Sequence, residues 1–321
     1  MQQLGYDDIK AAGDRIAGEV LPVGVQPAEP GAFGLADGGG ELWLALEYLQ
    51  HTGSFKARGA ANFLRAHREA GTLPDAGVTI ASGGNAGLAC AWAARRQDVR
   101  ATVFLPETAP PVKVAKLRGY GAEVRLVGTE YAEALAACEE FAAESGALAS
   151  HAYDHPLIAA GAGTVLEEIH RQLPGLDTVL VAVGGGGLFA GVATAAREHG
   201  IRTVAVEPEN CRALNAALAA GRPVDVPVES IAADSLGARR ATALAVQAAR
   251  SGGAASVLVP DGAIREARQL LWDERRIAVE LGTAAALAAL TTGAYRPAAG
   301  ERVCVVLCGA NTDPEDLGAA R

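Results

Sequence analysis

Four short motifs in the sequence carry residue types that can do chemistry, and the first surrounds Lys56. The stretch from Thr52 to Ala60 reads Thr-Gly-Ser-Phe-Lys-Ala-Arg-Gly-Ala and joins an apolar run, 42–46, to a helical stretch, 61–70. A lysine near a helix start lies among positive backbone N–H dipoles, which disfavour its ammonium form and favour the neutral amine needed for a Schiff base. Lys56 is therefore a candidate nucleophile, with a solvated helix-terminal lysine as the alternative.

The second and third motifs are glycine-rich turns, each placed between an apolar run and a helical run. Residues 82–86 read Ser-Gly-Gly-Asn-Ala, and residues 184–187 are four glycines followed by Leu188. Small residues let an anion approach the backbone N–H groups at a helix start, so the first turn suits a carboxylate and the second a monophosphate. A tight turn without ligand uses the same residue types. Glu207 follows the glycines by about 20 positions, the spacing of the acidic residue in dinucleotide-binding sites, so a dinucleotide site is a further alternative.

The fourth motif, 306–311, ends an apolar run with Cys308, Gly309 and Asn311. Ligands of open α/β sheets bind at the carboxyl ends of the strands, so this loop is expected beside the other three.

The elements that must position these motifs are short apolar runs that alternate with alanine-rich helical runs. The apolar runs are 42–46, 78–81, 101–105, 123–127, 179–183, 203–206 and 303–307. Their alternation with helices predicts an α/β protein with open, mostly parallel twisted sheets flanked by helices. No linker or internal repeat divides the chain, so two domains would be interleaved.

Charge and composition restrict the partners. The formal charge of −9 and the pI near 5.3 predict neither nucleic acid nor an anionic membrane surface as a partner. The uncharged stretch 178–196 is long enough for a membrane span, but each of its four central glycines would destabilise a helix by roughly 1 kcal/mol. We expect a strand, a turn and a helix there. Five cysteines without a CxxC pair or a secretory signal favour the cytoplasm.

In this order and spacing, the motifs resemble the fold-type-II pyridoxal-phosphate enzymes, the tryptophan-synthase-β-like family, and within it the serine/threonine dehydratases. The likeness runs from about residue 42 to residue 311 and includes the stretches 105–110, 119–124 and 160–164. The resemblance implies pyridoxal phosphate as cofactor, a small amino acid as substrate and a homodimer. It also implies a large cofactor-binding domain made of residues 1–75 and 151–321, and a small domain, 76–150, that carries the asparagine loop.

The resemblance also assigns a role to each motif. Lys56 is the catalytic residue and holds the cofactor as a Schiff base. The expected cofactor contacts are Phe55 on the ring, Asn85 on the ring hydroxyl, Cys308 at the pyridine nitrogen, and Gly184, Gly185, Gly186, Gly187 and Leu188 at the phosphate. The expected clamp for the substrate carboxylate consists of Ser82, Gly83, Asn85 and Ala86.

The thiol of Cys308 favours one reaction over others. A carboxylate facing the pyridine nitrogen keeps the ring protonated and stabilises a long-lived carbanion, whereas a thiol is only a weak donor and acceptor. A short-lived carbanion favours β-elimination over transamination. We therefore expect conversion of L-serine or L-threonine to pyruvate or 2-oxobutanoate and ammonia.

Several positions depart from relatives and leave alternatives open. Gly83 stands where serine racemases of the family carry a second acid/base, so efficient racemisation is not expected. Ala86, Cys308 and the stretch 233–237 resemble the catabolic serine dehydratase branch. Ala162 interrupts the Gly-Gln-Gly-Thr run of the family, so bulkier substrates such as phenylserine or 3-hydroxyaspartate stay open. A β-replacement lyase of the cysteine-synthase kind and a non-enzymatic ligand sensor are the further alternatives.

Three further parts of the sequence bear on a metal site, the chain end and the surface. Glu207 and Cys211 match a metal site of some relatives, but Ala213 replaces its aspartate, so Glu207 is only a weak metal candidate and no metal is expected. The chain ends ten residues after Asn311, which predicts no C-terminal regulatory domain. The arginine pair 239–240 is expected on a solvated helix face.

Overall fold

The computed structural model describes residues 3–34 and 40–317. Its helices are α1 (Tyr6–Ile16), α2 (Lys56–Glu69), α3 (Asn85–Arg96), α4 (Pro111–Gly119), α5 (Tyr131–Ser145), α6 (Pro156–Gln172), α7 (Gly187–Glu198), α8 (Ala213–Ala220), α9 (Ala233–Leu236), α10 (Ala243–Gly252), α11 (Asp261–Arg275) and α12 (Leu281–Thr291). Its strands are β1 (Val25–Pro27), β2 (Glu41–Ala45), β3 (Val78–Ala81), β4 (Ala101–Leu105), β5 (Glu123–Leu126), β6 (Leu148–Ala149), β7 (Thr178–Ala182), β8 (Arg202–Pro208), β9 (Ala255–Val259) and β10 (Arg302–Val306). Short 3-10 turns are η1 (Ala32–Gly34), η2 (Glu47–Leu49), η3 (His51–Gly53) and η4 (Pro314–Leu317).

The strands form two separate sheets. One has six strands in the order β1-β2-β10-β7-β8-β9, and the other has four in the order β5-β4-β3-β6. All neighbouring strands are parallel except β1 and β2. The pairing of Val305 with Leu44 on one side and Leu180 on the other brings the carboxyl ends of β2, β10 and β7 to one edge. The prediction of an α/β fold with mostly parallel sheets is confirmed.

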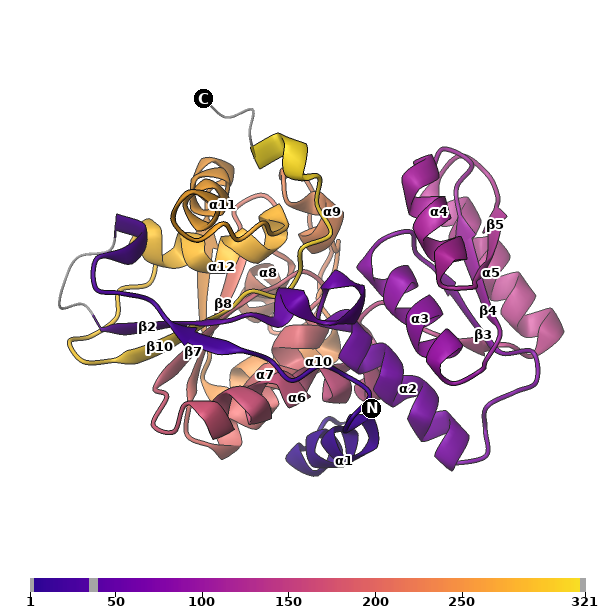
Figure 1. Cartoon of the computed structure of the whole chain (residues 1–321), viewed down its shortest axis with the longest axis horizontal. Helices are drawn as coiled ribbons and strands as arrows, with labels where there is room; N and C mark the ends of the chain where they lie inside the picture. The colour runs from indigo at the N-terminus through magenta and orange to yellow at the C-terminus, as the bar shows by residue number, and fades with distance from the viewer. Residues whose placement is uncertain (1–2, 35–39, 318–321) are drawn as a thin grey trace.

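Helices cover both faces of each sheet (Figure 1). On the six-stranded sheet, α1, α6, α7 and α10 pack on one face, whereas α11 and α12 pack on the other. On the four-stranded sheet, α2, α3 and α4 share one core and α5 lies on the opposite face. All five residues of β7 are buried, as expected of a parallel strand covered on both sides. The stretch 178–196 is therefore a strand, a turn and the start of α7.

The four-stranded sheet spans residues 78–149, inside the segment 76–150 that the sequence assigns to a small domain. The domain boundaries themselves stay a prediction. Phe63 and Leu64 of α2 belong to the same buried cluster as Ile80 and Val103, so α2 precedes this segment in sequence but packs with it. Figure 1 shows α2 between the two lobes.

Three strands and one helix start differ from the sequence expectation. β1, β6 and β9 were not predicted, because the first two are only three and two residues long and β9 is a half-buried edge strand. The helix expected over 61–70 begins earlier, at Lys56. Among the described residues, no helix is both long and apolar enough to span a bilayer.

Candidate active site

A cavity of about 800 Å³ lies where loops from the two sheets meet. Every residue that the sequence assigned to the cofactor or substrate lines it: Phe55, Lys56, Ser82, Gly83, Asn85, Ala86, Gly184, Gly185, Gly186, Gly187, Leu188 and Cys308. The loops that carry them follow β3, β7 and β10 or precede α2, as expected of a site at the carboxyl ends of parallel strands. The structure brings these residues together; their individual roles stay predictions.

Lys56 is the first residue of α2 and lies half-buried in the cavity wall. Its Nζ donates a hydrogen bond to the carbonyl of Ala152 at 3.0 Å and lies 4.7 Å from the centre of the Phe55 ring. Burial lowers the pKa of this amine to about 8, while the nearby Cys308 and Glu280 oppose the shift. The largest cause is desolvation, which disfavours the charged ammonium form. An amine with this pKa is partly neutral near physiological pH.

The four glycines form a backbone cradle before α7. Within the described part of the chain, no protein group accepts a hydrogen bond from the N–H groups of residues 184–189. Gly186 has a left-handed conformation, with φ of 95°, and a Cβ there would lie 2.4 Å from the Cβ of Ala245. A Cβ on Gly185 would lie 2.3 Å from the ring of Tyr153. Unpartnered N–H groups at a helix start fit a phosphate group.

The asparagine loop forms a second cradle before α3. The N–H groups of residues 83–87 also lack protein acceptors in the part of the chain that the structure describes. A Cβ on Gly83 would lie 2.8 Å from a methyl group of Leu105, and one on Gly87 would lie 1.8 Å from the carbonyl oxygen of Ser82. Small residues are therefore required for this tight turn. Its free donors can hold a carboxylate beside Lys56.

Asn85 is held by two partners from distant parts of the chain. Its Nδ2 donates to both carboxylate oxygens of Glu280, at 2.8 and 3.0 Å, and its Oδ1 accepts from Nδ2 of Asn311 at 2.7 Å. Glu280 is buried, and this burial raises the pKa of its carboxyl group. The sequence reasoning missed Glu280, because a glutamate before an alanine-rich helix has no feature that separates it from a surface residue.

Cys308 follows β10 and is buried against Thr283 of α12. The Thr283 hydroxyl lies 3.3 Å from the sulfur and donates to the carbonyl of Gly309 at 2.9 Å. A carbonyl can only accept, so the hydroxyl proton is used there and the thiol of Cys308 is the donor to Thr283. Burial raises the pKa of Cys308 to about 12, which keeps the thiol neutral.

Comparison with known proteins agrees with this geometry. The family model described as "Pyridoxal-phosphate dependent enzyme" matches residues 28–309. The chain belongs to this family. Pyridoxal phosphate is its cofactor, so the cofactor predicted from the sequence is confirmed, and the free N–H cradle beside a lysine of lowered pKa fits that group.

Individual relatives of this pyridoxal-phosphate enzyme have related chemistry but different substrates. The L-threonine ammonia-lyase of Geobacter sulfurreducens is 39% identical over 280 residues, covering 86% of this chain and 68% of that protein. The phenylserine dehydratase of Ralstonia pickettii is 38% identical over 274 residues, covering 84% and 82%. Maize serine racemase superposes with a TM-score of 0.90 at 29% identity, covering 99% of this chain and 96% of that one.

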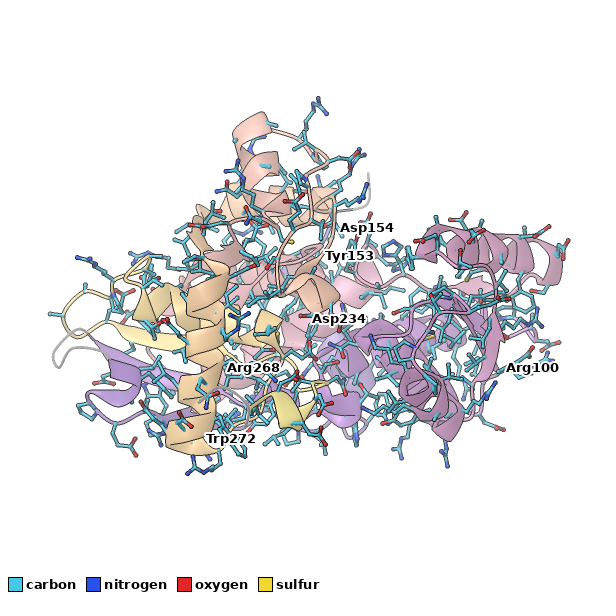
Figure 2. All side chains as sticks on the ribbon, turned by 90° about the horizontal axis from the view of Figure 1, so that it is seen from above. Arg100, Tyr153, Asp154, Asp234, Arg268 and Trp272 are labelled. Carbon is cyan, nitrogen blue, oxygen red and sulfur yellow. The ribbon has the colours of Figure 1, made fainter. Side chains whose placement is uncertain are left out.

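The lining of the enzyme's cavity includes charged and aromatic residues that sequence reasoning did not select. Lys113 of α4 forms an ion pair with Asp234 of α9 at 3.1 Å, which joins the two lobes. Figure 2 shows Tyr153, Asp154 and Asp234 in the region between the lobes. Tyr131 also lines the cavity. Aromatic and charged residues are common on surfaces, so their types alone gave no signal.

The arginine pair 239–240 is exposed, as expected, but the expectation that it lies on a helix is wrong. Both residues lie in the loop between α9 and α10 rather than on a helix, because α9 ends at Leu236. Both side chains are exposed; Arg239 also lines the cavity, and Arg240 pairs with Asp225 at 2.7 Å.

The carboxylate of Glu207, the weak metal candidate, is hydrogen-bonded to the start of α8. Its two oxygens accept the backbone N–H groups of Leu214 and Asn215, each at 2.7 Å. Burial raises the pKa of Glu207 to about 7. Among the described residues, no three His, Cys, Asp or Glu side chains are grouped to hold a metal ion. The carboxylate therefore caps a helix in this enzyme.

Proposed function

We propose that this enzyme is an ammonia-lyase that removes the β-hydroxyl of L-serine or L-threonine, giving pyruvate or 2-oxobutanoate and ammonia. The neutral thiol of Cys308 in the cofactor cavity carries the proposal. A neutral group next to the pyridine nitrogen favours rapid loss of a β-substituent over reactions that need a long-lived carbanion. The similarity to an L-threonine ammonia-lyase supports the same reaction.

Lys56 supplies the catalytic amine. Its Nζ would hold the cofactor and would accept the α-proton of the substrate; a pKa of about 8 suits both tasks near neutral pH. When bound, pyridoxal phosphate supplies an electron sink for the charge left at the α-carbon. In the cofactor-free protein, the carbonyl of Ala152 accepts a hydrogen bond from Nζ at 3.0 Å and holds the free amine at the cavity wall.

The remaining residues bind and orient. The free N–H groups of residues 184–188 would hold the phosphate, Phe55 would pack against the ring and Asn85 would donate to the ring hydroxyl. The asparagine loop, 82–86, holds the substrate carboxylate and so fixes the α C–H bond relative to Lys56.

Gly83 separates this enzyme from racemases. A racemase needs a second acid on the face opposite the lysine, and Gly83 has no side chain to supply it. Leu105 lies 2.8 Å from where a Cβ would stand, so a serine would also require Leu105 to move. We therefore expect elimination without efficient racemisation.

A bulkier β-hydroxy amino acid is the second candidate substrate. The cavity is lined by Phe104, Tyr131 and Tyr153, whose apolar rings can contact an aromatic β-substituent. The similarity to a phenylserine dehydratase supports this alternative. A second carboxylate, as in 3-hydroxyaspartate, would need Lys113 or Arg239 as its partner.

One assay compares these substrates. Purified enzyme is mixed with L-serine, L-threonine or phenylserine while release of the 2-oxo acid is followed, with Lys56→Ala as the matched control. Oxo acid from serine or threonine, formed only by the unmutated enzyme, supports the proposal. Release from phenylserine alone would replace the substrate assignment. A yellow enzyme that forms no oxo acid from any of them would direct attention to β-replacement or to ligand sensing.

We further propose a homodimer in the cytoplasm. All five cysteines are free and buried, which suits a reducing compartment. Light scattering coupled to size-exclusion chromatography measures the mass; a monomeric mass would contradict the dimer.

A further inference from the structure

A chain of hydrogen bonds joins four loops around the cavity. It runs from Glu280, before α12, to Asn85, then to Asn311 and the carbonyl of Thr52. The last bond, from Asn311 Nδ2 to Thr52, is 2.6 Å long. The backbone N–H of Asn311 also donates to Glu280 at 3.0 Å, which closes the network into a ring. All four residues are more than 30 positions apart in the sequence.

The donors and acceptors in this network fix the orientation of both side-chain amides. The carbonyl of Thr52 can only accept, so the side chain of Asn311 must present its NH₂ group there and to Asn85. Asn85 therefore accepts through Oδ1, and its Nδ2 must face Glu280. The Glu280 carboxylate accepts this donor. A flip of the Asn85 amide would place Oδ1 of Asn85 against the Glu280 oxygens and its Nδ2 against Nδ2 of Asn311, and neither pair can form a hydrogen bond.

One N–H of Asn85 is left over. Both Glu280 oxygens lie within 3.0 Å of the same nitrogen, so a single shared N–H satisfies them. Among the described residues, no other acceptor contacts Nδ2, and Asn85 lines the cavity. The second N–H is thus available to a ligand.

The other end of the network is held in an uncommon backbone conformation. Thr52 has φ of 63°, which β-branched residues rarely adopt. Thr52 lies four residues before Lys56, and its conformation directs its carbonyl toward Asn311. Strained residues of this kind persist where surrounding contacts hold them, often at functional sites.

We propose that Glu280 is a positioning residue that fixes the amide of Asn85 so that its free N–H points to the ring oxygen of the cofactor. The proposal rests on the proposed contact between Asn85 and that oxygen. Glu280 acts on the cofactor through Asn85, and Asn311 supports the same amide from its other end.

The test uses the holoenzyme and measures two properties besides activity: the dissociation constant of pyridoxal phosphate and the visible absorption spectrum of the bound cofactor. Glu280→Gln replaces one acceptor oxygen with an NH₂ group, so that two donors face each other beside Nδ2 of Asn85 and the hold on that amide is weakened. We expect the dissociation constant to rise roughly tenfold, the size of one hydrogen bond to a charged group. The spectrum should shift toward the form that carries a proton on the ring oxygen.

A double-mutant cycle separates action through Asn85 from other effects, because Glu280 also lies near Lys56. In the Asn85→Ala background, Glu280→Gln should change the dissociation constant by less than about twofold. An equal effect in both backgrounds overturns the proposal, as does a Glu280→Gln enzyme with the wild-type constant and spectrum. If Asn85→Ala alone changes neither property, the assigned contact of Asn85 fails and the proposal with it, while the ammonia-lyase assay stands independently.

A third variant tests the proposal even if Glu280→Gln does not fold, and a fourth is a control. Asn311→Ala removes the other partner of the Asn85 amide without changing charge, so it should shift the spectrum in the same direction. An unchanged spectrum would count against the proposal. Glu274→Gln alters a carboxylate that accepts from Phe33, away from the cavity, and should leave both properties unchanged.

Discussion

Thr283 holds the thiol proton of Cys308. The hydroxyl oxygen lies 3.3 Å from the sulfur, and the hydroxyl donates a hydrogen bond to the carbonyl of Gly309. The pair anchors α12 to the loop after β10, and both side chains are buried. The two hydrogen bonds therefore depend on a single hydroxyl group.

Thr283→Val should lower the free energy of unfolding by about 1–3 kcal/mol, because it leaves the Gly309 carbonyl and the thiol without partners in a buried site. Denaturant unfolding measures the change. Thr291→Val, a partly buried position on the same helix, is the control and should cost less. Equal costs at the two positions would show that the Thr283 hydroxyl has no special role.

Arg58 should be indispensable for folding. It is fully buried and pairs with Glu47 and Glu168, each at 2.7 Å. Arg58→Met leaves two carboxylates without their partner, and loss of one member of a buried pair costs about 3–5 kcal/mol. Thermal unfolding measures the loss. Arg240→Met breaks the exposed pair with Asp225 and should change stability by less than about 1 kcal/mol.

Gly185→Ala should weaken cofactor binding at least about tenfold, since the new Cβ would meet the Tyr153 ring at 2.3 Å and displace the cradle. Titration with pyridoxal phosphate measures the affinity. Adding Tyr153→Ala should recover part of the loss by opening space. Gly262→Ala, where a Cβ meets nothing within 4 Å, is the control. A Gly185→Ala enzyme that binds normally would mean that the cradle tolerates the added methyl group.

The pKa of Lys56 predicts a pH-dependent stability difference. In the cofactor-free protein its pKa is about 8 when folded, against 10.5 for an ordinary lysine. Between these values the unfolded chain binds more protons, so wild-type stability should rise with pH relative to Lys56→Met. Below pH 8, burying the charged lysine lowers the free energy of unfolding of the wild type by its full amount, on the order of 3 kcal/mol. Unfolding at several pH values measures this, and a constant difference would contradict it.

Lys10 provides the control of opposite sign for that experiment. Its ion pair with Asp7 raises its pKa, so its contribution is lost, not gained, as pH rises. The difference between wild type and Lys10→Met should therefore not increase between pH 8 and 10.5.

Divalent cations should have no effect on stability at Glu207. Its oxygens are used by the N–H groups of Leu214 and Asn215, and Ala213 offers no ligand. Thermal unfolding with Mg²⁺, with Ca²⁺ and with a chelator should give the same Tm. A saturable rise in Tm would reveal a cation site.

The sequence predicted the parts of the fold and the cavity that depend on local patterns. Apolar runs followed by glycines mark a buried parallel strand and a helix start, so the loops with Asn85 and Gly184 could be located before the structure. Glu280 could not be, because it lies 195 residues from Asn85 and acts only through tertiary contact. Arg239 was misplaced because α9 ends after four residues, where the N–H of Gly237 donates to the carbonyl of Ala233.

The cradle of residues 184–189 presents only main-chain donors to the cavity. Any amino acid except proline offers such an N–H, so the chemistry of this cradle places almost no demand on side-chain identity. The demand comes from Tyr153 and Ala245, which occupy the space that side chains would need. At Gly185, whose added Cβ would meet the Tyr153 ring, a smaller residue at position 153 could therefore relax this demand, whereas Gly186, with φ of 95°, would stay restricted by its backbone conformation.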